Sequence, residues 1–291
     1  MTTIIDGAAI AASLRLEVKQ GAERLAAKGI VPGLAAVLVG DDPASAIYVR
    51  NKGRACAEAG LFSDTVRLPG ATSQQELLAV VDRLNRDPRI HGILVQLPLP
   101  PRIDPRAVVH TISPAKDVDC LHPQNVGRLL IGEPHFLPCT PAGVQELLLR
   151  SGYPPEGRHV VICGRSNLVG KPLAAMLMQK APGANATVTV CHTGTRDLAE
   201  ITRTADILVA AMGQSRSITA DMVREGVVVI DVGTNRVEDP SASRGWRLAG
   251  DVDFDAVAPK AAAITPVPGG VGPMTIAMLL RNVLRAAQMA D

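Results

Sequence analysis

Tyr48 and Lys52 form the first pair in the chain whose residue types and spacing could support chemistry. They lie four residues apart in the helical pattern near Ala44–Ala59, and residues at i and i+4 share one face of a helix. A phenol and an ammonium group would therefore project into the same space. A solvated helix face with a surface lysine has the same spacing, so the pair is informative only together with other segments.

An amide and two carboxylates lie further along the chain. Gln96 interrupts the apolar run Gly92–Leu97, and a buried amide needs hydrogen-bond partners. Asp117 and Asp119 follow Lys116 in a loop after a proline, where aspartate is also an ordinary turn or cap residue. With the tyrosine–lysine pair these groups have the composition of a site, although periodicity alone does not say that they meet.

A glycine-containing turn has the form of a nucleotide-binding loop. His159–Cys163 predicts a strand, and Gly164 and Gly170 frame the turn into the next predicted helix. A helix N-terminus presents free N–H groups and a positive dipole end, which suit a pyrophosphate. Ser166 and Val169 occupy the second and third positions of the usual G-x-G-x-x-G, so an ordinary strand–helix turn remains the alternative.

The end of the next predicted strand, Thr187–Cys191, favours NADP over NAD. NAD-specific sites carry an acid there that binds the ribose hydroxyls, whereas this chain has no acid before Asp197. Arg165, Thr193 and Arg196 suit a 2′-phosphate instead, because the arginine fork matches phosphate geometry. NAD remains the alternative, and a comparison of the two affinities separates them.

The elements that must position these residues alternate between short apolar runs and amphipathic stretches. This alternation indicates an α/β protein with parallel sheets covered on both faces. The predicted strands are Leu34–Val39, Gly92–Leu97, His159–Cys163, Thr187–Cys191, Ile207–Ala211 and Val227–Val232. The predicted helices are Ala8–Lys28, Ala44–Ala59, Ser73–Asn85, Pro141–Arg150, Gly170–Gln179, Arg196–Arg203 and Pro273–Met289.

The chain is predicted to divide at Leu137-Pro138-Cys139-Thr140-Pro141, since two X-Pro steps make a natural joint before a helix. We expect one domain over residues 1–140 and a nucleotide-binding domain over residues 141–272. The last helix, within residues 273–291, is expected to return to the first domain.

Composition excludes several classes of protein. The 30 basic and 28 acidic residues nearly cancel, and one Trp, two Tyr and three Phe are too few for a base-stacking platform, so we expect no nucleic-acid partner. Five cysteines without a C-x-x-C pair predict neither a disulfide framework nor a metal site. The start of the chain lacks a basic signal-peptide region, and the uncharged stretch 261–280 is interrupted by Pro266, Pro268 and Pro273. A cytoplasmic protein without a membrane span is expected.

A set of ordered motifs carries a resemblance to one family. The motifs are Tyr48–Lys52, Val95–Pro100, Lys116–Asp119, Gly164–Pro172, Asp231–Gly233, Gly250–Val252 and Thr265–Thr275. In them the chain resembles the bifunctional methylenetetrahydrofolate dehydrogenase/methenyltetrahydrofolate cyclohydrolase family (FolD type). The resemblance implies two α/β domains with a cleft between them, the second a Rossmann-type NADP-binding domain, and a homodimer. It also implies NADP-dependent oxidation of 5,10-methylenetetrahydrofolate, followed by hydrolysis to 10-formyltetrahydrofolate.

The same resemblance implies roles for individual residues. Lys52 is the catalytic lysine, assisted by Tyr48, Gln96 and Asp119, of which the tyrosine packs on the folate and the aspartate holds the pterin. The implied substrate-binding residues are Tyr48, Lys52, Gln96, Leu97, Pro98, Asp119, Pro268, Gly269 and Gly270. The implied cofactor-binding residues are Gly164, Arg165, Ser166, Gly170, Thr193, Thr195, Gly213, Gly233, Thr234, Gly272 and Thr275. The chain departs from the family at Cys120, where glycine is common.

Two other interpretations remain beside the bifunctional enzyme. One is an enzyme that keeps a single activity, and the retained Lys52 argues against loss of the cyclohydrolase. The other is a non-catalytic nucleotide- or folate-binding regulator, which would be expected to lack part of the catalytic set. Addition of methylenetetrahydrofolate and NADP⁺ distinguishes turnover from binding alone.

Overall fold

The computed structural model describes residues 1–242 and 245–290, which form two compact units. Unit 1 comprises Met1–Ala11 and Thr140–Thr275, and unit 2 comprises Ala12–Cys139 and Ile276–Asp291. The first eleven residues thus belong with unit 1, whereas the sequence predicted a single domain over residues 1–140. The reason is a two-residue strand, β1 (Thr3–Ile4), that pairs with β11 (Ala263–Ile264) at the edge of the unit 1 sheet.

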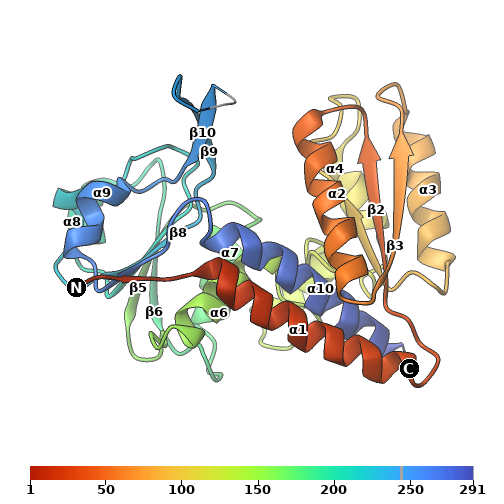
Figure 1. The fold of residues 1–291 in the computed structure, drawn as a ribbon, viewed down its shortest axis with the longest axis horizontal. Coiled ribbons are helices and arrows are strands. Elements are labelled where there is room, and N and C mark those ends of the chain that lie inside the picture. Colours follow the sequence, from red (N-terminus) through yellow and green to blue (C-terminus); the bar gives the residue numbers. More distant parts are fainter. Residues whose placement is uncertain (243–244, 291) are drawn as a thin grey trace. The chain divides into compact units, whose positions relative to one another are not determined.

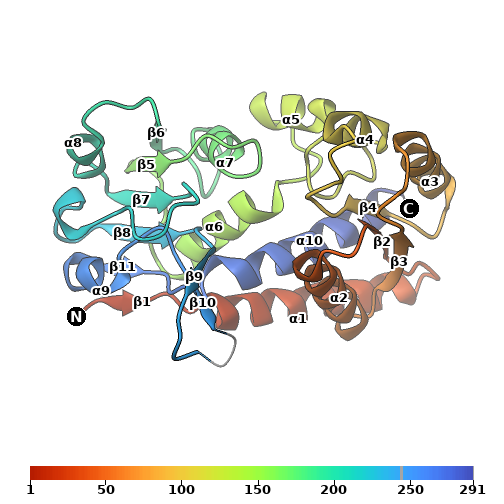
Figure 2. The same ribbon diagram turned by 90° about the horizontal axis from the view of Figure 1, so that it is seen from above.

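Unit 1 is built on a six-stranded parallel sheet in the order β1-β11-β8-β7-β5-β6. Its other strands are β5 (His159–Cys163), β6 (Thr187–Cys191), β7 (Ile207–Ala210) and β8 (Val228–Asp231). Its helices include α6 (Cys139–Arg150), α7 (Gly170–Leu177), α8 (Leu198–Thr202) and α9 (Phe254–Val257). Figures 1 and 2 show α8 and α9 on one side of this sheet and α6 and α7 on the other. A separate antiparallel hairpin joins β9 (Asn235–Glu238) to β10 (Trp246–Ala249).

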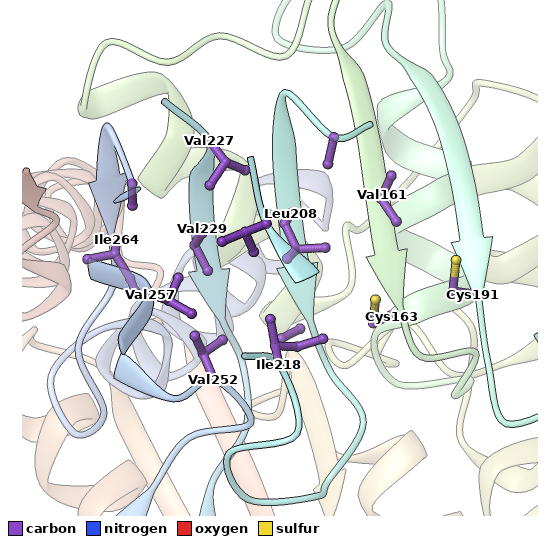
Figure 3. Close-up of a cluster of buried hydrophobic side chains, with 14 residues drawn as sticks. Val161, Cys163, Cys191, Leu208, Ile218, Val227, Val229, Val252, Val257 and Ile264 are labelled. Carbon is purple, nitrogen blue, oxygen red and sulfur yellow. The ribbon is translucent and has the colours of Figure 1, made fainter. Parts of the chain in front are cut away.

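The core on one face of the unit 1 sheet consists of small and branched aliphatic side chains (Figure 3). Val161, Leu208, Val229 and Ile264 come from four neighbouring strands and are each 0% exposed. Alternate residues of a strand point to the same face, so each short strand contributes only one or two side chains to this layer. The opposite face is buried by the helices on the other side, which explains the nearly continuous apolar runs in these strands.

Unit 2 contains a three-stranded parallel sheet in the order β3-β2-β4. The strands are β2 (Gly33–Val39), β3 (Phe62–Leu68) and β4 (Gly92–Val95). The helices are α1 (Gly7–Ala26), α2 (Pro43–Glu58), α3 (Gln74–Arg86), α4 (Pro105–Thr111), α5 (Pro123–Leu130) and α10 (Val271–Met289), of which α1 and α10 each extend over both units. None of the helices in the described ranges is long and apolar enough to cross a membrane.

The two faces of β2 pack on different helices. Ala35 and Val37 lie in a cluster with α3 side chains such as Leu77, whereas Ala36 packs with Val49 of α2. Figures 1 and 2 accordingly show α2 and α3 on opposite sides of this sheet. Every residue of β2 is buried, which is the pattern of a central parallel strand.

Candidate active site

Helix α2 presents Tyr48 and Lys52 on adjacent turns. The helix begins after Asp42, whose carboxylate accepts a hydrogen bond from the Ser45 N–H over 2.7 Å. Val49, only 1% exposed, anchors the helix in the core of unit 2. Tyr48 remains 51% exposed, and Lys52 is half-buried at the edge of the packed face. The phenol ring is therefore available to a ligand, while the lysine lies closer to the sheet.

Lys52 meets Gln96, the residue that follows β4. Lys52 Nζ donates a hydrogen bond to Gln96 Oε1 over 3.1 Å. Gln96 Nε2 donates to the Leu97 carbonyl over 2.7 Å, and the Gln96 N–H donates to the Val37 carbonyl over 2.9 Å. The backbone of Gln96 is thus fixed to the central strand, and its amide is turned so that the carbonyl faces the lysine.

The two aspartates of the Lys116–Asp119 motif have different surroundings. Asp117 is 2% exposed and accepts hydrogen bonds from the N–H groups of Leu121 (3.1 Å) and His122 (2.8 Å). It also accepts one from Asn125 Nδ2 over 2.8 Å. Asp117 therefore holds the turn that leads into α5, which is the structural role of an aspartate in a turn.

Asp119 is half-buried and contacts Cys139, whose thiol donates to Asp119 Oδ1 over 3.4 Å. Burial raises the pKa of Asp119, and the positive charge of Lys52 acts in the opposite direction. Burial, together with the charge of Asp119, raises the pKa of Cys139 well above that of an ordinary thiol. Cys139 is consequently a neutral thiol at neutral pH. No sequence pattern predicts this contact, because Cys139 lies twenty residues from Asp119, in the segment interpreted as a joint between domains.

Cys120 takes a left-handed backbone conformation, with φ +58°. This conformation costs a residue with a side chain about 1–2 kcal/mol, and glycine adopts it freely. The side chain is buried and its thiol donates to the Phe136 carbonyl over 3.3 Å. The position that follows Asp119 therefore keeps a turn suited to glycine even though cysteine occupies it.

A small pocket opens beside Asp119 within unit 2. Its walls are mostly aliphatic and include Leu94, Leu97, Leu99 and Val108. Pro98 is joined to Leu97 by a cis peptide bond and is exposed. Asp119 is one of only two acidic residues that line the pocket.

The glycine turn of unit 1 has no room for side chains. Gly164 has φ +138°, and a Cβ there would lie 2.1 Å from the Ala211 carbonyl oxygen. A Cβ on Gly170 would lie 1.9 Å from the Gly164 carbonyl oxygen. Ser166 instead closes the turn, since its Oγ accepts a hydrogen bond from the Val169 N–H over 3.0 Å. The turn lies where strand order reverses between β5, β6 and β7, the usual ligand crevice of an open α/β sheet. This tight cradle before α7 fits a dinucleotide.

The turn after β6 is stabilised by its own side chains. Thr195 Oγ1 accepts a hydrogen bond from the His192 N–H over 2.8 Å, and His192 Nδ1 accepts one from the Gly194 N–H over 3.1 Å. His192 therefore shapes the turn. The residues expected near a 2′-phosphate are exposed: Arg165, Thr193 and Arg196.

The remaining predicted site residues all belong to unit 1. Gly213 and Gly233 donate their N–H groups to the buried Asp251 and Asp231, respectively, each over 2.9 Å. Thr275 Oγ1 lies 3.0 Å from Thr140 Oγ1. Thr234, Pro268 and Gly272 are exposed, Gly269 is half-buried and Gly270 is buried. The structure thus joins Lys52 to Gln96 by a hydrogen bond in unit 2, and the charge of Lys52 acts on Asp119 of the same unit, whereas residues 268–270 belong to unit 1.

Two family models match the chain. The catalytic domain of tetrahydrofolate dehydrogenase/cyclohydrolase matches residues 5–119, and the NAD(P)-binding domain matches residues 138–291. The chain belongs to the tetrahydrofolate dehydrogenase/cyclohydrolase family. The bifunctional protein FolD of Dehalococcoides mccartyi strain CBDB1 is 61% identical over 289 residues, which cover 99% of this chain and 97% of that protein.

Solved structures of family members have the same fold. The FolD enzyme of Campylobacter jejuni has a TM-score of 0.94 and 48% identity, over 99% of both chains. The Trypanosoma brucei FolD, complexed with NADP cofactor and an inhibitor, has a TM-score of 0.93 and 44% identity, over 99% of this chain and 98% of its own. These matches confirm the predicted family and the two-domain α/β fold, and the second family model makes residues 138–291 an NAD(P)-binding domain.

Proposed function

We propose that this tetrahydrofolate dehydrogenase/cyclohydrolase performs its chemistry at Lys52, with Gln96, Asp119 and Tyr48 around it. The chain oxidises 5,10-methylenetetrahydrofolate with NADP⁺ and hydrolyses the 5,10-methenyl product to 10-formyltetrahydrofolate. The observation that carries the proposal is the Lys52–Gln96 hydrogen bond. The positive charge of Lys52 also acts on Asp119, whose pKa it lowers against the effect of burial. NADP⁺, when bound, accepts the hydride.

Oxidation needs orientation more than acid–base chemistry. The methylene carbon lies between two nitrogens, whose lone pairs expel the hydride and stabilise the resulting cation. The chain therefore has to hold the folate in one position. Asp119 accepts two neighbouring N–H donors of the pterin, and the Cys139 thiol keeps the carboxylate in a fixed orientation. The exposed ring of Tyr48 packs against the folate.

Hydrolysis requires protons to move. Water adds to the methenyl carbon, one of its protons leaves, the carbon–N5 bond breaks and the other proton ends on N5. Lys52 is the group positioned to pass a proton, as a neutral amine that accepts it and as an ammonium that returns it. Gln96 orients this amine through a neutral carbonyl, so it directs the lysine without adding a charge.

The decisive experiment follows turnover of the purified protein. Methylenetetrahydrofolate and NADP⁺ are added, and NADPH and the methenyl compound are followed by absorbance. NADPH formation with rapid decay of the methenyl compound supports both activities. Decay no faster than in buffer indicates a dehydrogenase alone, and ligand binding without NADPH indicates a regulator.

The protein acts on tetrahydrofolate derivatives, without nucleic acid, as a homodimer in the cytoplasm. The near balance of 30 basic and 28 acidic residues supports a small-molecule role over nucleic-acid binding. Light scattering after size exclusion is expected to give twice the mass of the 30.5 kDa chain, and the mass of one chain would contradict the dimer.

A further inference from the structure

Two buried aspartates fix the backbone at the carboxyl end of the unit 1 sheet. Asp231 is the last residue of β8 and is 4% exposed, and Asp251 comes two residues after β10 and is 0% exposed. The Asp231 N–H donates to Thr265 Oγ1 over 2.8 Å, so the pair is tied to the segment that follows β11. Burial of a carboxylate costs free energy unless hydrogen bonds replace its lost hydration. Both carboxylates accept backbone N–H groups from nearby loop segments.

The segment 212–214 wraps around the Asp251 carboxylate. The N–H groups of Met212 and Gly213 donate to Oδ2 over 2.5 and 2.9 Å, and that of Gln214 donates to Oδ1 over 2.9 Å. Asn235 Nδ2 donates to Oδ1 over 2.8 Å. Three successive N–H groups that converge on one anion form a nest, whose shape depends on that anion.

Asp231 accepts hydrogen bonds from the backbone at and after Asp251. Its Oδ1 accepts the N–H groups of Gly233 and Asp251, each over 2.9 Å, and its Oδ2 accepts that of Val252 over 3.0 Å. The glycines of the two motifs are required by this arrangement. A Cβ on Gly233 would lie 2.4 Å from the Asp251 carboxylate carbon, and one on Gly250 would lie 1.8 Å from Asp231 Oδ2.

The nest adjoins the glycine turn of the cofactor site. Ala211, the residue before the nest, donates its N–H to the Cys163 carbonyl over 2.8 Å, and its own carbonyl oxygen lies where a side chain on Gly164 would begin. A shift of the segment 212–214 would therefore be transmitted to the turn at Gly164. Gly213 itself has φ +67°, so the segment has a special backbone shape to maintain.

We infer that Asp251 is a positioning residue for the cofactor: its carboxylate sets the backbone of 212–214 against the glycine turn, and Asp231 holds Asp251 in place. The inference rests on the proposed function only in that unit 1 binds NADP. Loss of the Asp251 carboxylate is expected to weaken NADP binding. It is not expected to affect the hydrolysis of methenyltetrahydrofolate, which uses no cofactor.

The test compares two aspartate-to-asparagine variants of the full chain by calorimetric titration with NADP. Asp251→Asn replaces an accepting oxygen by an amino group, and its Kd for NADP is expected to rise tenfold or more. Hydrolysis of added methenyltetrahydrofolate should stay within twofold of wild type. The matched control is Asp206→Asn: Asp206 immediately precedes β7, at the other end of the sheet, and accepts the His159 N–H over 2.7 Å. Its Kd should stay within twofold.

A second variant protects the test against misfolding. If Asp251→Asn does not fold, Asn235→Ala removes one donor from the same carboxylate at a half-buried position and is expected to raise the Kd about threefold. A wild-type Kd in a folded Asp251→Asn or in Asn235→Ala would overturn the inference, as would an equal loss in Asp206→Asn. A wild-type chain that binds NADP without folate turnover would refute the proposed function and leave the inference standing.

Discussion

Lys52 Nζ and Gln96 Oε1 are joined by a hydrogen bond of 3.1 Å, between a helix and the end of a strand. Helix α2 packs on one face of β2, and β4 pairs directly with β2, so the central strand brings the two side chains together. The Gln96 backbone is also bonded to this strand. The helix that carries Lys52 and the residue that binds its amine are thus both fixed to the buried strand β2. A fixed position suits a group that has to pass a proton to one atom of the substrate.

Replacement of Lys52 by methionine separates the two activities. Lys52→Met keeps an unbranched side chain, one atom shorter, and removes the amine, so hydrolysis of the methenyl compound should fall by about 100-fold or more, while NADPH formation remains measurable. Separate assays of the two steps check this. Lys19→Met, at an exposed position of α1, serves as the control and should leave both rates unchanged. Full cyclohydrolase activity in Lys52→Met would contradict the assignment.

The two aspartates of the 116–119 motif are expected to respond differently to alanine. Asp119→Ala removes a charged acceptor for the pterin and should raise KM for the folate by roughly 10- to 100-fold in both reactions. Asp117→Ala leaves backbone N–H groups without their acceptor and should lower the free energy of unfolding by about 2 kcal/mol or more. Steady-state kinetics and urea unfolding measure the two effects. A normal KM in Asp119→Ala would exclude its role in binding.

A methyl group at Gly164 should disrupt the cofactor turn. Gly164→Ala places a Cβ 2.1 Å from the Ala211 carbonyl oxygen, so the backbone must move, at a cost of about 2 kcal/mol or more. NADP affinity should fall with it. Gly157→Ala is the matched control, because Gly157 also has positive φ, +70°, with nothing within 4 Å of the added carbon. That change should cost about 1 kcal/mol of stability and leave NADP affinity intact. Equal NADP affinities in both variants would argue against the turn as the site.

The pH dependence of stability should reveal the buried Asp231. Burial raises the pKa of Asp231 to about 6, from 3.8. The folded protein thus binds the proton more tightly than the unfolded chain, so this contribution to stability is present below about pH 4 and is lost as the pH rises through about 6. Its size is about 3 kcal/mol, from two units of pKa.

Urea unfolding of the wild type and of Asp231→Asn across this range measures the contribution. The unfolding free energy of the wild type minus that of the variant should fall by about 3 kcal/mol between pH about 4 and about 7. A difference that does not change with pH would show that Asp231 titrates near its ordinary value.

Much of the fold could be predicted from hydrophobic periodicity. The strands β5 and β6 have the predicted bounds, β2 and β7 differ by one residue at one end, and β8 is one residue shorter at each end. The edge strand β3 was missed because its sequence, Phe62–Leu68, alternates exposed and half-buried residues without an apolar run. The strand predicted to reach Leu97 ends at Val95, and the short helices α4 and α5 are too brief to show a helical period.

Sequence patterns predict less of the candidate site than of the fold. Tyr48 and Lys52 share a helix, so their spacing was enough to place them on one face. No pattern distinguishes Asp117 from Asp119, since the difference lies in which backbone groups surround each carboxylate. The thiol of Cys139 and the nest around Asp251 depend on contacts between residues far apart in the sequence, which only the fold determines.

The sheet of unit 1 includes strand β1, whose Thr3 and Ile4 pair with Ala263 and Ile264. Unit 2 needs residues from 276 onward, among them Asn282, whose side chain donates to the Val118 and Leu137 carbonyls over 2.7 and 2.8 Å. During translation, therefore, unit 1 cannot pair its first strand until Ala263 and Ile264 have been made, and unit 2 cannot be completed until residues from 276 onward follow. The nascent protein must keep its first strand unpaired while some 260 further residues are added.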